Sequence, residues 1–264
     1  NARAQCARTD PTPATPPDMT YCIGLNLDEG LLFASDSRTN AGVDDVRRFG
    51  KMRVFAVDGD RVIVILSAGN LSLTQNTLNL LEYRANHGDG IGLYSAQSMF
   101  EVASLVGDAM REIRKRDAPY LRDTGIDASG TFIVGGQIKG EAPRLFLVYS
   151  EGNFIESNPD TPYFQTGEIK FGKPILDRMV TPQTSLDQAT KCALVSFDST
   201  MRSNLSVGPP IDLLRYRRDA LSIDLKMRLE DDDPYLNQVR SHWNDSLRSA
   251  LESLPTPAWM APRG

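Results

Sequence analysis

The sequence predicts a four-layer α/β/β/α sandwich, in which two antiparallel sheets pack face to face and a helical layer covers each outer side. Strand-like segments and pairs of helix-like segments follow one another in the order strands, helices, strands, helices, strands, which is typical of layered α+β domains. No linker interrupts residues 20–254, so we expect a single domain there. Residues 1–19, with several prolines and no apolar period, read as a disordered leader or a wrongly assigned start, and residues 255–264 as a loose tail.

Two hairpins open the predicted domain. The segment TYCIGLNL alternates, with Tyr21, Ile23, Leu25 and Leu27 on one face, and the turn DEG leads into LLFASDSR. The second hairpin joins KMRVFAV to RVIVILSAG. Because both of its strands are nearly continuous apolar runs, we expect them to be covered on both faces.

The later elements follow from helical spacing and turn residues. Asn70 is expected to cap a helix that runs to His87, with a buried leucine stripe. The remaining expected elements are a helix over 95–117, strands in TFIVGGQI, PRLFLVYS, GNFIES and PYFQTGE, helices near 171–180 and 185–204, strands in IDLLRYRR and SIDLKMRLE, and a helix from Pro234 to Leu254. The acidic run at 230–234 reads as a solvated turn before that last helix.

Composition excludes several classes of function. A net charge of -5, from 29 basic and 34 acidic residues, gives no reason to expect a nucleic-acid partner. No apolar run reaches the roughly 18 residues that a membrane helix needs. Three cysteines without C-x-x-C spacing suggest neither a disulfide scaffold nor a zinc site. The only histidines, His87 and His242, lie at a helix end and on a polar helix, so we expect neither to serve in a catalytic triad.

An enzyme without a usable histidine can still activate a hydroxyl when the nucleophile is the first residue of the chain, because its own α-amine then serves as the base. The pair Met19-Thr20 allows this in two ways. Translation could begin at Met19, which is then removed before a small residue, or a leader could cleave itself off. Either route would expose the amine of Thr20, whose unperturbed pKa of about 7.7 to 8.0 suits a base at neutral pH.

The run TYCIGLNLDEGLLFASDSRTNAGVDDVRRFGKMRVF resembles the start of proteasome β-type subunits, and specifically the bacterial proteasome-related group called Anbu; LSAGNLSLTQ, GEIKFGKPILDR and DSTMRSNLSVGPPIDLLRY extend the resemblance to most of 20–254. The resemblance implies an N-terminal-nucleophile hydrolase fold. It also implies Thr20 as the nucleophile, Asp36 as the residue that orients the catalytic Lys51, and Gly69 as the backbone N–H donor to the oxyanion.

The resemblance is weaker in the supporting residues. Proteasome β-subunits carry a serine after the strand that resembles PYFQTGE, where this chain has Gly167 and Glu168. Their Asp-x-x-Ser element aligns with Ser203 to Ser206, so the aspartate is missing while Ser206 is kept as a candidate site residue. Glu168 is expected either to face the cleft or to pair with a cation such as Lys170 or Arg178.

Each site residue also has a structural reading. Thr20 has high strand propensity, Asp36 suits a strand end, and Lys51 suits an edge strand, where a charge discourages aggregation. Cys22 is expected to be a small buried hydrophobic residue, because nothing near it in sequence would lower its pKa. The joint placement of Thr20, Asp36 and Lys51 in one motif favours the catalytic interpretation.

The sequence therefore predicts a cytoplasmic, self-assembling threonine hydrolase that cleaves amide bonds in peptides and needs no metal or organic cofactor. The resemblance implies a homo-oligomer, either a closed ring or an open helical assembly, and the sequence names no unfoldase partner. Two alternatives stay open. One is a catalytically idle assembly or scaffold subunit, favoured by the missing aspartate, and the other is an amidase that acts on small non-peptide amides.

Overall fold

The computed structural model describes residues 20–40, 46–88, 90–123 and 125–260. These residues form two five-stranded antiparallel sheets. The first sheet has the order β10-β1-β2-β11-β12 and the second β5-β6-β7-β8-β9, with a short ribbon of β3 and β4 beside them. The strands are β1 (Tyr21–Leu27), β2 (Gly30–Asp36), β3 (Arg38–Asn40), β4 (Val46–Arg48), β5 (Met52–Val57), β6 (Arg61–Gly69), β7 (Gly130–Ile138), β8 (Arg144–Val148), β9 (Phe154–Glu156), β10 (Tyr163–Gly167), β11 (Ile211–Arg217) and β12 (Leu225–Leu229).

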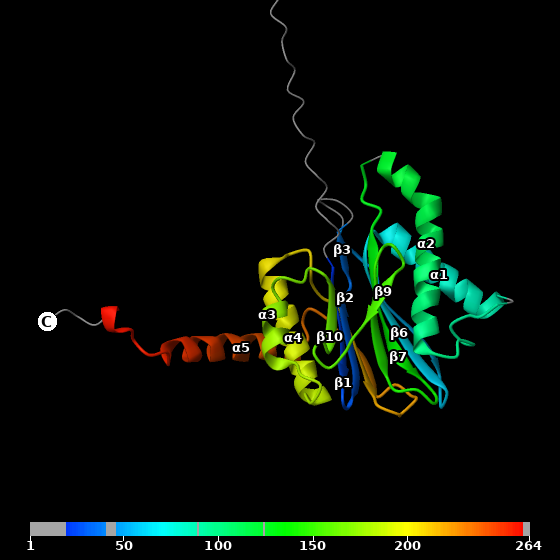
Figure 1. Cartoon of the computed structure of the whole chain (residues 1–264). Helices are drawn as coiled ribbons and strands as arrows, with labels where there is room; N and C mark the ends of the chain where they lie inside the picture. Colours follow the sequence, from blue (N-terminus) through cyan, green and yellow to red (C-terminus); the bar gives the residue numbers. More distant parts are fainter. Residues whose placement is uncertain (1–19, 41–45, 89, 124, 261–264) are drawn as a thin grey trace, which may run out of the picture.

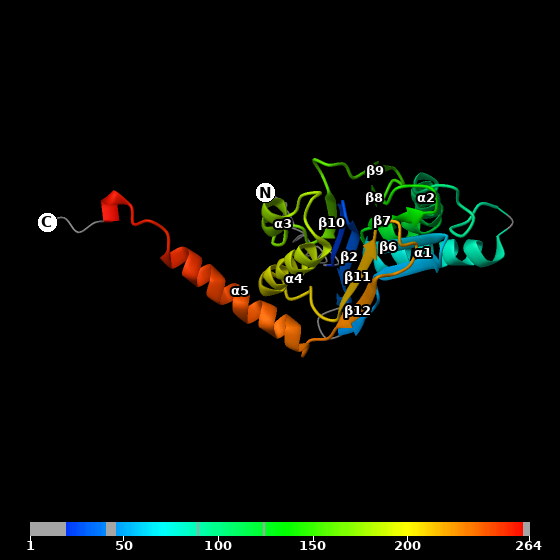
Figure 2. The same ribbon diagram turned by 90° about the horizontal axis from the view of Figure 1, so that it is seen from below.

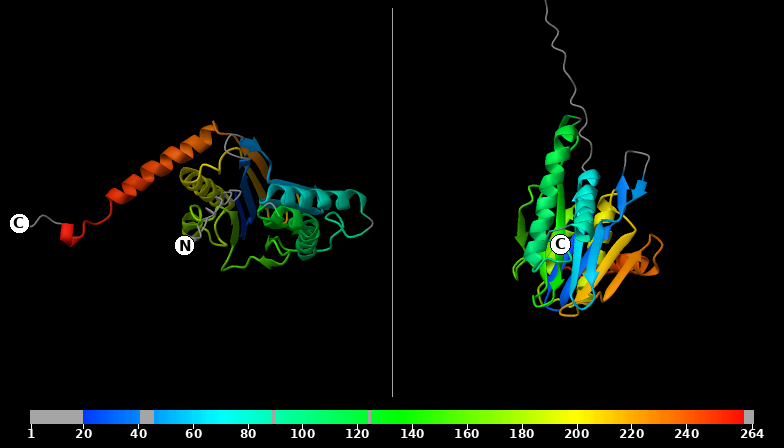
Figure 3. Two further views of the ribbon diagram at one scale, coloured as in Figure 1. Left: turned by 90° about the horizontal axis from the view of Figure 1, so that it is seen from above. Right: turned by 90° about the vertical axis from the view of Figure 1, so that its right-hand side faces the viewer.

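Helices cover the outer side of each sheet, as Figures 1 and 3 show. The second sheet carries α1 (Leu71–His87) and α2 (Met99–Asp123), and the first carries α3 (Lys173–Met179) and α4 (Leu186–Ser203). Three apolar clusters fill the spaces between the four layers. The four-layer α/β/β/α sandwich predicted from the sequence is therefore confirmed.

Strand β1 lies in the middle of this arrangement because its two faces serve different layers. Tyr21, Ile23 and Leu25 are fully buried against the α3 and α4 side, while Cys22 is buried between the sheets. Gly24 marks the closest approach of the two sheets, since a Cβ there would lie 2.7 Å from Ile133. The predicted alternation is confirmed, and it fixes the position of the residue just before the strand, Thr20.

Two boundaries differ from the sequence-based expectation. Helix α2 begins at Met99 rather than at Ser95, because the Ser98 hydroxyl accepts the N–H of Glu101 (3.1 Å) and so caps the helix there. It also continues past Pro119 to Asp123, where Leu121 still packs on a buried cluster. The cap at Asn70 is confirmed, since its side-chain oxygen accepts the N–H of Leu73.

The expectation that both strands of the second hairpin are covered on both faces is wrong for β5. Every residue of β6 from Arg61 to Ala68 is buried, but β5 is an edge strand whose Val57 is 44% exposed. A strand at the sheet edge pairs on one side only, so a continuous apolar run does not guarantee cover.

Helix α5 (Pro234–Glu252) follows β12 and projects away from the sandwich (Figures 1 and 2). Asp233 caps its start by accepting the N–H groups of Tyr235 and Leu236, which confirms the predicted acidic turn and helix. Leu236 is its one buried side chain among the described residues. None of the helices in the described ranges is long and apolar enough to cross a membrane.

Candidate active site around Thr20

Thr20 lies immediately before β1 and is buried. Its carbonyl oxygen accepts the N–H of Glu168 at 2.6 Å, which ties the start of β1 to the end of β10. Gly167 makes this approach possible, because it has φ +86° and a Cβ there would lie 1.8 Å from the Thr20 oxygen. The backbone of Thr20 is therefore held by its neighbour strand as well as by the chain that follows it.

Asp36 and Lys51 form a buried ion pair beside Thr20. Asp36 ends β2 and Lys51 precedes β5, and the Lys51 Nζ lies 2.7 Å from Asp36 Oδ1. The same carboxylate oxygen accepts the backbone N–H of Tyr21 at 3.0 Å. Lys51 Nζ also donates to the carbonyl of Arg38 at 2.7 Å. The structure therefore brings Asp36 and Lys51 together and joins them to the backbone of Tyr21, the residue that follows Thr20.

Burial dominates the electrostatics of this pair. Asp36 is fully buried and Lys51 is 6% exposed. Removal from water raises the pKa of Asp36, while the Lys51 ammonium and the backbone N–H groups of Tyr21 and Gly208 oppose this rise. The edge-strand reading of Lys51 does not hold, because a lysine that discourages aggregation at a strand edge must be exposed to water.

Gly69 ends β6 with φ +103°, and a Cβ there would lie 2.7 Å from the carbonyl oxygen of Ser129. The N–H groups of Ser67 and Asn70 donate to Lys51 and Ser129 respectively. Since N–H groups alternate in direction along a strand, this pattern turns the Gly69 N–H toward the β5 side of β6. Gly69 also lines a cavity of about 430 Å³ together with Glu168.

Glu168 faces that cavity rather than a cation. One carboxylate oxygen accepts the side-chain amide of Asn204 at 3.1 Å, and the other accepts the backbone N–H of Lys170 at 3.3 Å. Of the two arrangements left open by the sequence, the structure favours the cleft-facing one, since Glu168 lines the cavity and has no cation partner among the described residues. Asn204 is buried, and its side-chain oxygen accepts the N–H of Ser206 at 2.9 Å, so Ser206 joins the same group through Asn204.

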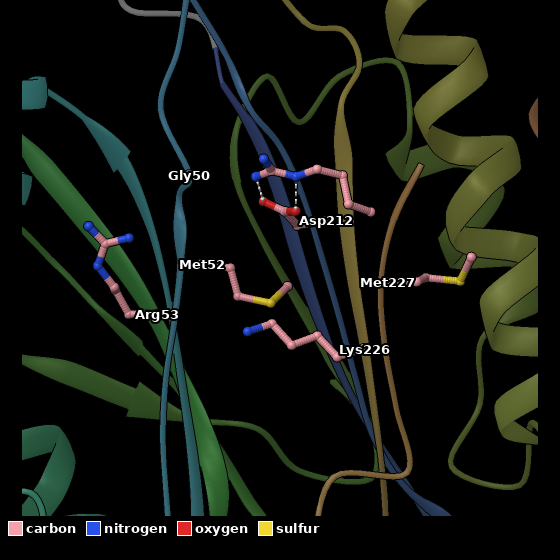
Figure 4. Close-up of a pocket in the computed structure, with 7 residues that line it drawn as sticks. Gly50, Met52, Arg53, Asp212, Lys226 and Met227 are labelled. Carbon is pink, nitrogen blue, oxygen red and sulfur yellow. Dashed lines mark hydrogen bonds and ion pairs between the residues drawn. The ribbon is translucent and has the colours of Figure 1, made fainter. Parts of the chain in front are cut away.

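A second cavity of about 430 Å³ lies between β5 and β12, as Figure 4 shows. Arg228 on β12 and Asp212 on the adjacent strand β11 form two hydrogen bonds of 2.7 and 2.8 Å on one wall of this cavity, and Asp212 also accepts the Ser37 hydroxyl at 3.1 Å. Because Ser37 follows Asp36 in the chain, this polar chain fixes the end of β2 from the side opposite Thr20.

The other candidate groups lie outside the site or are inert. Cys22 is fully buried, its thiol points at the carbonyl of Ser67, and burial raises its pKa, so the expected packing role is confirmed. His87 ends α1 and His242 lies on α5, both exposed. In the described ranges no group of His, Cys, Asp and Glu side chains has the arrangement of a metal site.

Solved structures of similar chains settle the family. An Anbu (ancestral beta-subunit) protein from Yersinia bercovieri is 47% identical, with a TM-score of 0.85, covering 90% of this chain and 98% of that one. The chain belongs to the Anbu group. The helical assembly of the Anbu complex from Pseudomonas aeruginosa matches at 47% identity and a TM-score of 0.87, with coverage of 92% and 100%. Anbu from Hyphomicrobium sp. strain MC1 is 45% identical, with a TM-score of 0.82, covering 90% of this chain and 99% of that one.

No family model and no curated protein matches the chain, so membership of the Anbu group rests on the structural comparison. This extent of identity and coverage confirms the resemblance inferred from the sequence motifs.

One residue of this Anbu site escaped the sequence analysis. The alignment of the Asp-x-x-Ser element placed Ser203 at its first position, but Ser203 is exposed and the next residue, Asn204, reaches Glu168. Asn204 ends α4, and its N–H donates to Thr200. The signal available in the sequence was its place directly after the helical pattern, since asparagine is frequent where a helix ends.

Proposed function

We propose that this protein is an N-terminal-nucleophile hydrolase that cleaves amide bonds by acyl transfer to Thr20, with peptides as the substrate class. The observation that carries the proposal is the buried pair of Asp36 and Lys51, joined to the backbone of Tyr21 and thus directly to the residue after Thr20. A buried ion pair contributes little to stability by itself. Its attachment to the backbone next to Thr20 supports a role in tuning a nucleophile there.

In the proposed cycle the α-amine of Thr20 accepts the hydroxyl proton, directly or through a water, as the oxygen attacks the substrate carbonyl. The ammonium of Lys51 lowers the pKa of that amine and favours the deprotonated nucleophile. The N–H of Gly69 stabilises the oxyanion, a contribution of about 3 kcal/mol for one donor in such sites. The amine then protonates the leaving group, and a water hydrolyses the threonine ester.

The proposal needs a chain in which Thr20 is the first residue, because the nitrogen of a peptide-bonded threonine has no basic lone pair. In the printed sequence Met19 precedes Thr20. Removal of everything before Thr20 would create the base and the nucleophile together.

We also propose a homo-oligomer. The Pseudomonas aeruginosa relative is described as a helical assembly, and the projecting helix α5 supports the same behaviour here. Leu247, Leu251 and Leu254, spaced to share one face of α5 and its extension, are 49%, 70% and 63% exposed. Trp259 is 83% exposed further along. An apolar stripe of this kind suits contact with another copy of the chain.

The competing function is an assembly subunit without catalysis. The missing aspartate of the Asp-x-x-Ser element, whose position aligns with Ser203, favours it. The fully buried Asp36 and Lys51 disfavour it, because an idle subunit has no need to keep two charges out of water.

The test combines intact mass, N-terminal sequencing and labelling by an electrophilic peptide probe. A chain that begins at Thr20 is expected to gain one probe mass, and Thr20→Ala none. Cys22→Ala is the matched control and should label like the wild type, because the Cys22 thiol is buried and protonated. Absence of labelling in a folded chain that begins at Thr20 would leave the assembly subunit as the better interpretation. Labelling by small acyl amides but not by peptides would point to an amidase.

A further inference from the structure

The segment after β10 and the loop after α4 meet at Glu168, whose backbone is bonded to Thr20. Glu168 touches Thr20 through its backbone, by the 2.6 Å hydrogen bond to the Thr20 carbonyl, and touches Asn204 through its carboxylate at 3.1 Å. These two contacts place the Glu168 carboxylate on a residue whose backbone is bonded directly to Thr20. Asp36, on the other side, is already engaged by Lys51.

Asn204 is built to hold that carboxylate in one orientation. Its side chain is 5% exposed, its oxygen accepts the N–H of Ser206, and its own N–H donates to Thr200 on the last turn of α4. With the amide oxygen fixed in this way, the amide nitrogen is the group that remains to face Glu168. The N–H of Lys170 holds the second carboxylate oxygen.

The glycine before Glu168 shows that this approach is specific. Gly167 combines φ +86° with the 1.8 Å clash that any Cβ would make with the Thr20 carbonyl. Only glycine lets β10 come this close, and the close approach is what brings Glu168 to the nucleophile.

We propose that Glu168 is a positioning residue, whose carboxylate, clamped by Asn204, pairs with the α-amine of Thr20, fixes its orientation and stabilises its protonated form. This proposal rests on the proposed function only in requiring a chain that begins at Thr20. The two residues then have opposite effects on the pKa of the amine, because the Lys51 ammonium lowers it and the Glu168 carboxylate raises it. Together they keep the amine pKa near neutrality, where a base is most useful.

Other charges near the nucleophile act through partners. The charged groups on the elements packed around the Thr20 backbone are Asp36, Arg38, Lys51, Lys170, Asp212 and Arg228. Asp36 and Lys51 neutralise each other, as do Asp212 and Arg228. Arg38 donates to the carbonyl of Leu205, and Lys170 is exposed to water. Loss of Glu168 is therefore expected to change the electrostatic potential at the amine more than loss of Arg38 or Lys170.

The first test measures the pKa of the Thr20 amine itself. A chain that begins at Thr20 is acetylated with limiting anhydride across a pH series, and the labelled N-terminal peptide is quantified by mass spectrometry. Glu168→Gln is expected to lower the amine pKa by about one unit, because a nearby carboxylate favours the ammonium. Asn204→Ala, which removes the clamp, should shift it in the same direction by less. Glu112→Gln, at an exposed glutamate on the outer helix α2 that pairs with Arg84 of α1, should leave it unchanged.

The second test moves the carboxylate from one segment to the other. Asn204→Asp alone places two carboxylates in contact and should raise the amine pKa, whereas the double variant Glu168→Ser with Asn204→Asp again has one carboxylate and should restore the pKa to within about half a unit of the wild type. A purely structural role for Glu168 predicts no rescue, because a carboxylate at position 204 would not replace the lost contacts of Glu168, and the double variant would then keep the amine pKa of the Glu168→Ser single variant.

Outcomes separate the two proposals. An unchanged amine pKa in folded Glu168→Gln would overturn the positioning role and assign Glu168 to the substrate cavity. The opposite combination would uphold the positioning role while overturning the hydrolase function. In that case the amine pKa is lower in Glu168→Gln than in the wild type, but the wild type never reacts with the peptide probe.

Discussion

The two sides of Thr20 are built differently. On one side Asp36 and Lys51 are 0% and 6% exposed and are held by strand backbone. On the other side Glu168 and Lys170 border a cavity of about 430 Å³ that opens to solvent. The buried side can set a pKa but cannot meet a substrate, while the open side can do both. In such a site the buried side of Thr20 can affect only the pKa of the nucleophile, and a substrate must bind from the open side.

The two sides also differ in how the chain assembles them. The buried pair joins the end of β2 in the first sheet to the residue before β5 in the second sheet, 15 residues further along the chain. The open side joins the end of β10 to the end of α4, two segments that meet only in the folded chain. Changes in sequence on the open side can therefore alter function without disturbing the sheet, which is where this chain departs from the proteasome pattern.

The largest expected difference between the sides is in stability. Lys51→Met removes the cation from a buried carboxylate and should cost about 3–5 kcal/mol in unfolding free energy at neutral pH. Lys170→Met, at an exposed lysine, should change it by less than about 0.5 kcal/mol. Urea unfolding of both variants measures the contrast.

The loss in Lys51→Met should depend on pH in a defined direction. Burial raises the pKa of Asp36, and without Lys51 that pKa rises further. Between the unfolded pKa of about 4 and the raised folded pKa, the folded state holds a proton that the unfolded state has released, so the variant should regain stability as the pH falls through the folded pKa toward about 4. A loss that is equal at pH 5 and pH 8 would show that Asp36 is not the group left unpaired.

A glycine pair isolates the approach of β10 to Thr20. Gly140 and Gly167 have φ values of +91° and +86°, but a Cβ at Gly140 meets nothing within 4 Å, whereas at Gly167 it would meet the Thr20 carbonyl at 1.8 Å. Gly140→Ala should cost about 1–2 kcal/mol, the strain of the left-handed backbone alone. Gly167→Ala should cost about 2 kcal/mol more and reduce probe labelling of Thr20. Equal thermal shifts for the two variants would contradict the close contact.

The contrast between the sides explains how far the sequence could predict this molecule. The alternation of β1, the cap at Asn70 and the placement of Asp36 and Lys51 all follow from local spacing or from one continuous motif, and the structure has them where expected. The role of Asn204 could not be predicted from the sequence, because it depends on the angle at which α4 ends. A shift of one residue in the alignment selects the side chain of Ser203 instead. The projection of α5 did not follow either, since helical spacing predicts a helix without specifying its contacts.

A smaller effect should come from Tyr21, the residue that links Thr20 to the helical layer. Its hydroxyl donates to Ser196 at 3.1 Å and accepts from Gln165 at 2.7 Å, and burial raises its pKa. Tyr21→Phe leaves those two partners without the hydroxyl and should cost about 1–2 kcal/mol at neutral pH. Tyr120→Phe, at a tyrosine that is 76% exposed, should be nearly neutral.

Alkaline pH sharpens the tyrosine comparison. In the unfolded chain Tyr21 ionises near pH 10, whereas in the folded chain its raised pKa keeps it protonated. Stability of the wild type should therefore fall as the pH rises above about 10. Tyr21→Phe should lose part of that slope and Tyr120→Phe should keep all of it. Identical slopes in urea unfolding at pH 9 and pH 11 would place Tyr21 in a more polar setting.

The smallest effect is expected in the exposed cluster of Tyr163, Lys173 and Asp177, on the α3 side of β10. Lys173 and Asp177 lie 2.9 Å apart with both side chains about half exposed, so Asp177→Ala should change stability by less than about 1 kcal/mol. Partial burial and the hydrogen bond to Asp177 raise the pKa of Tyr163 to about 12. Loss of Asp177 should lower that pKa, and ultraviolet titration against a Tyr163→Phe background would show it. A shift in pKa without a loss of stability would demonstrate that an exposed carboxylate beside β10 can tune a neighbouring group while leaving the fold intact, which is the property that the proposed role of Glu168 requires.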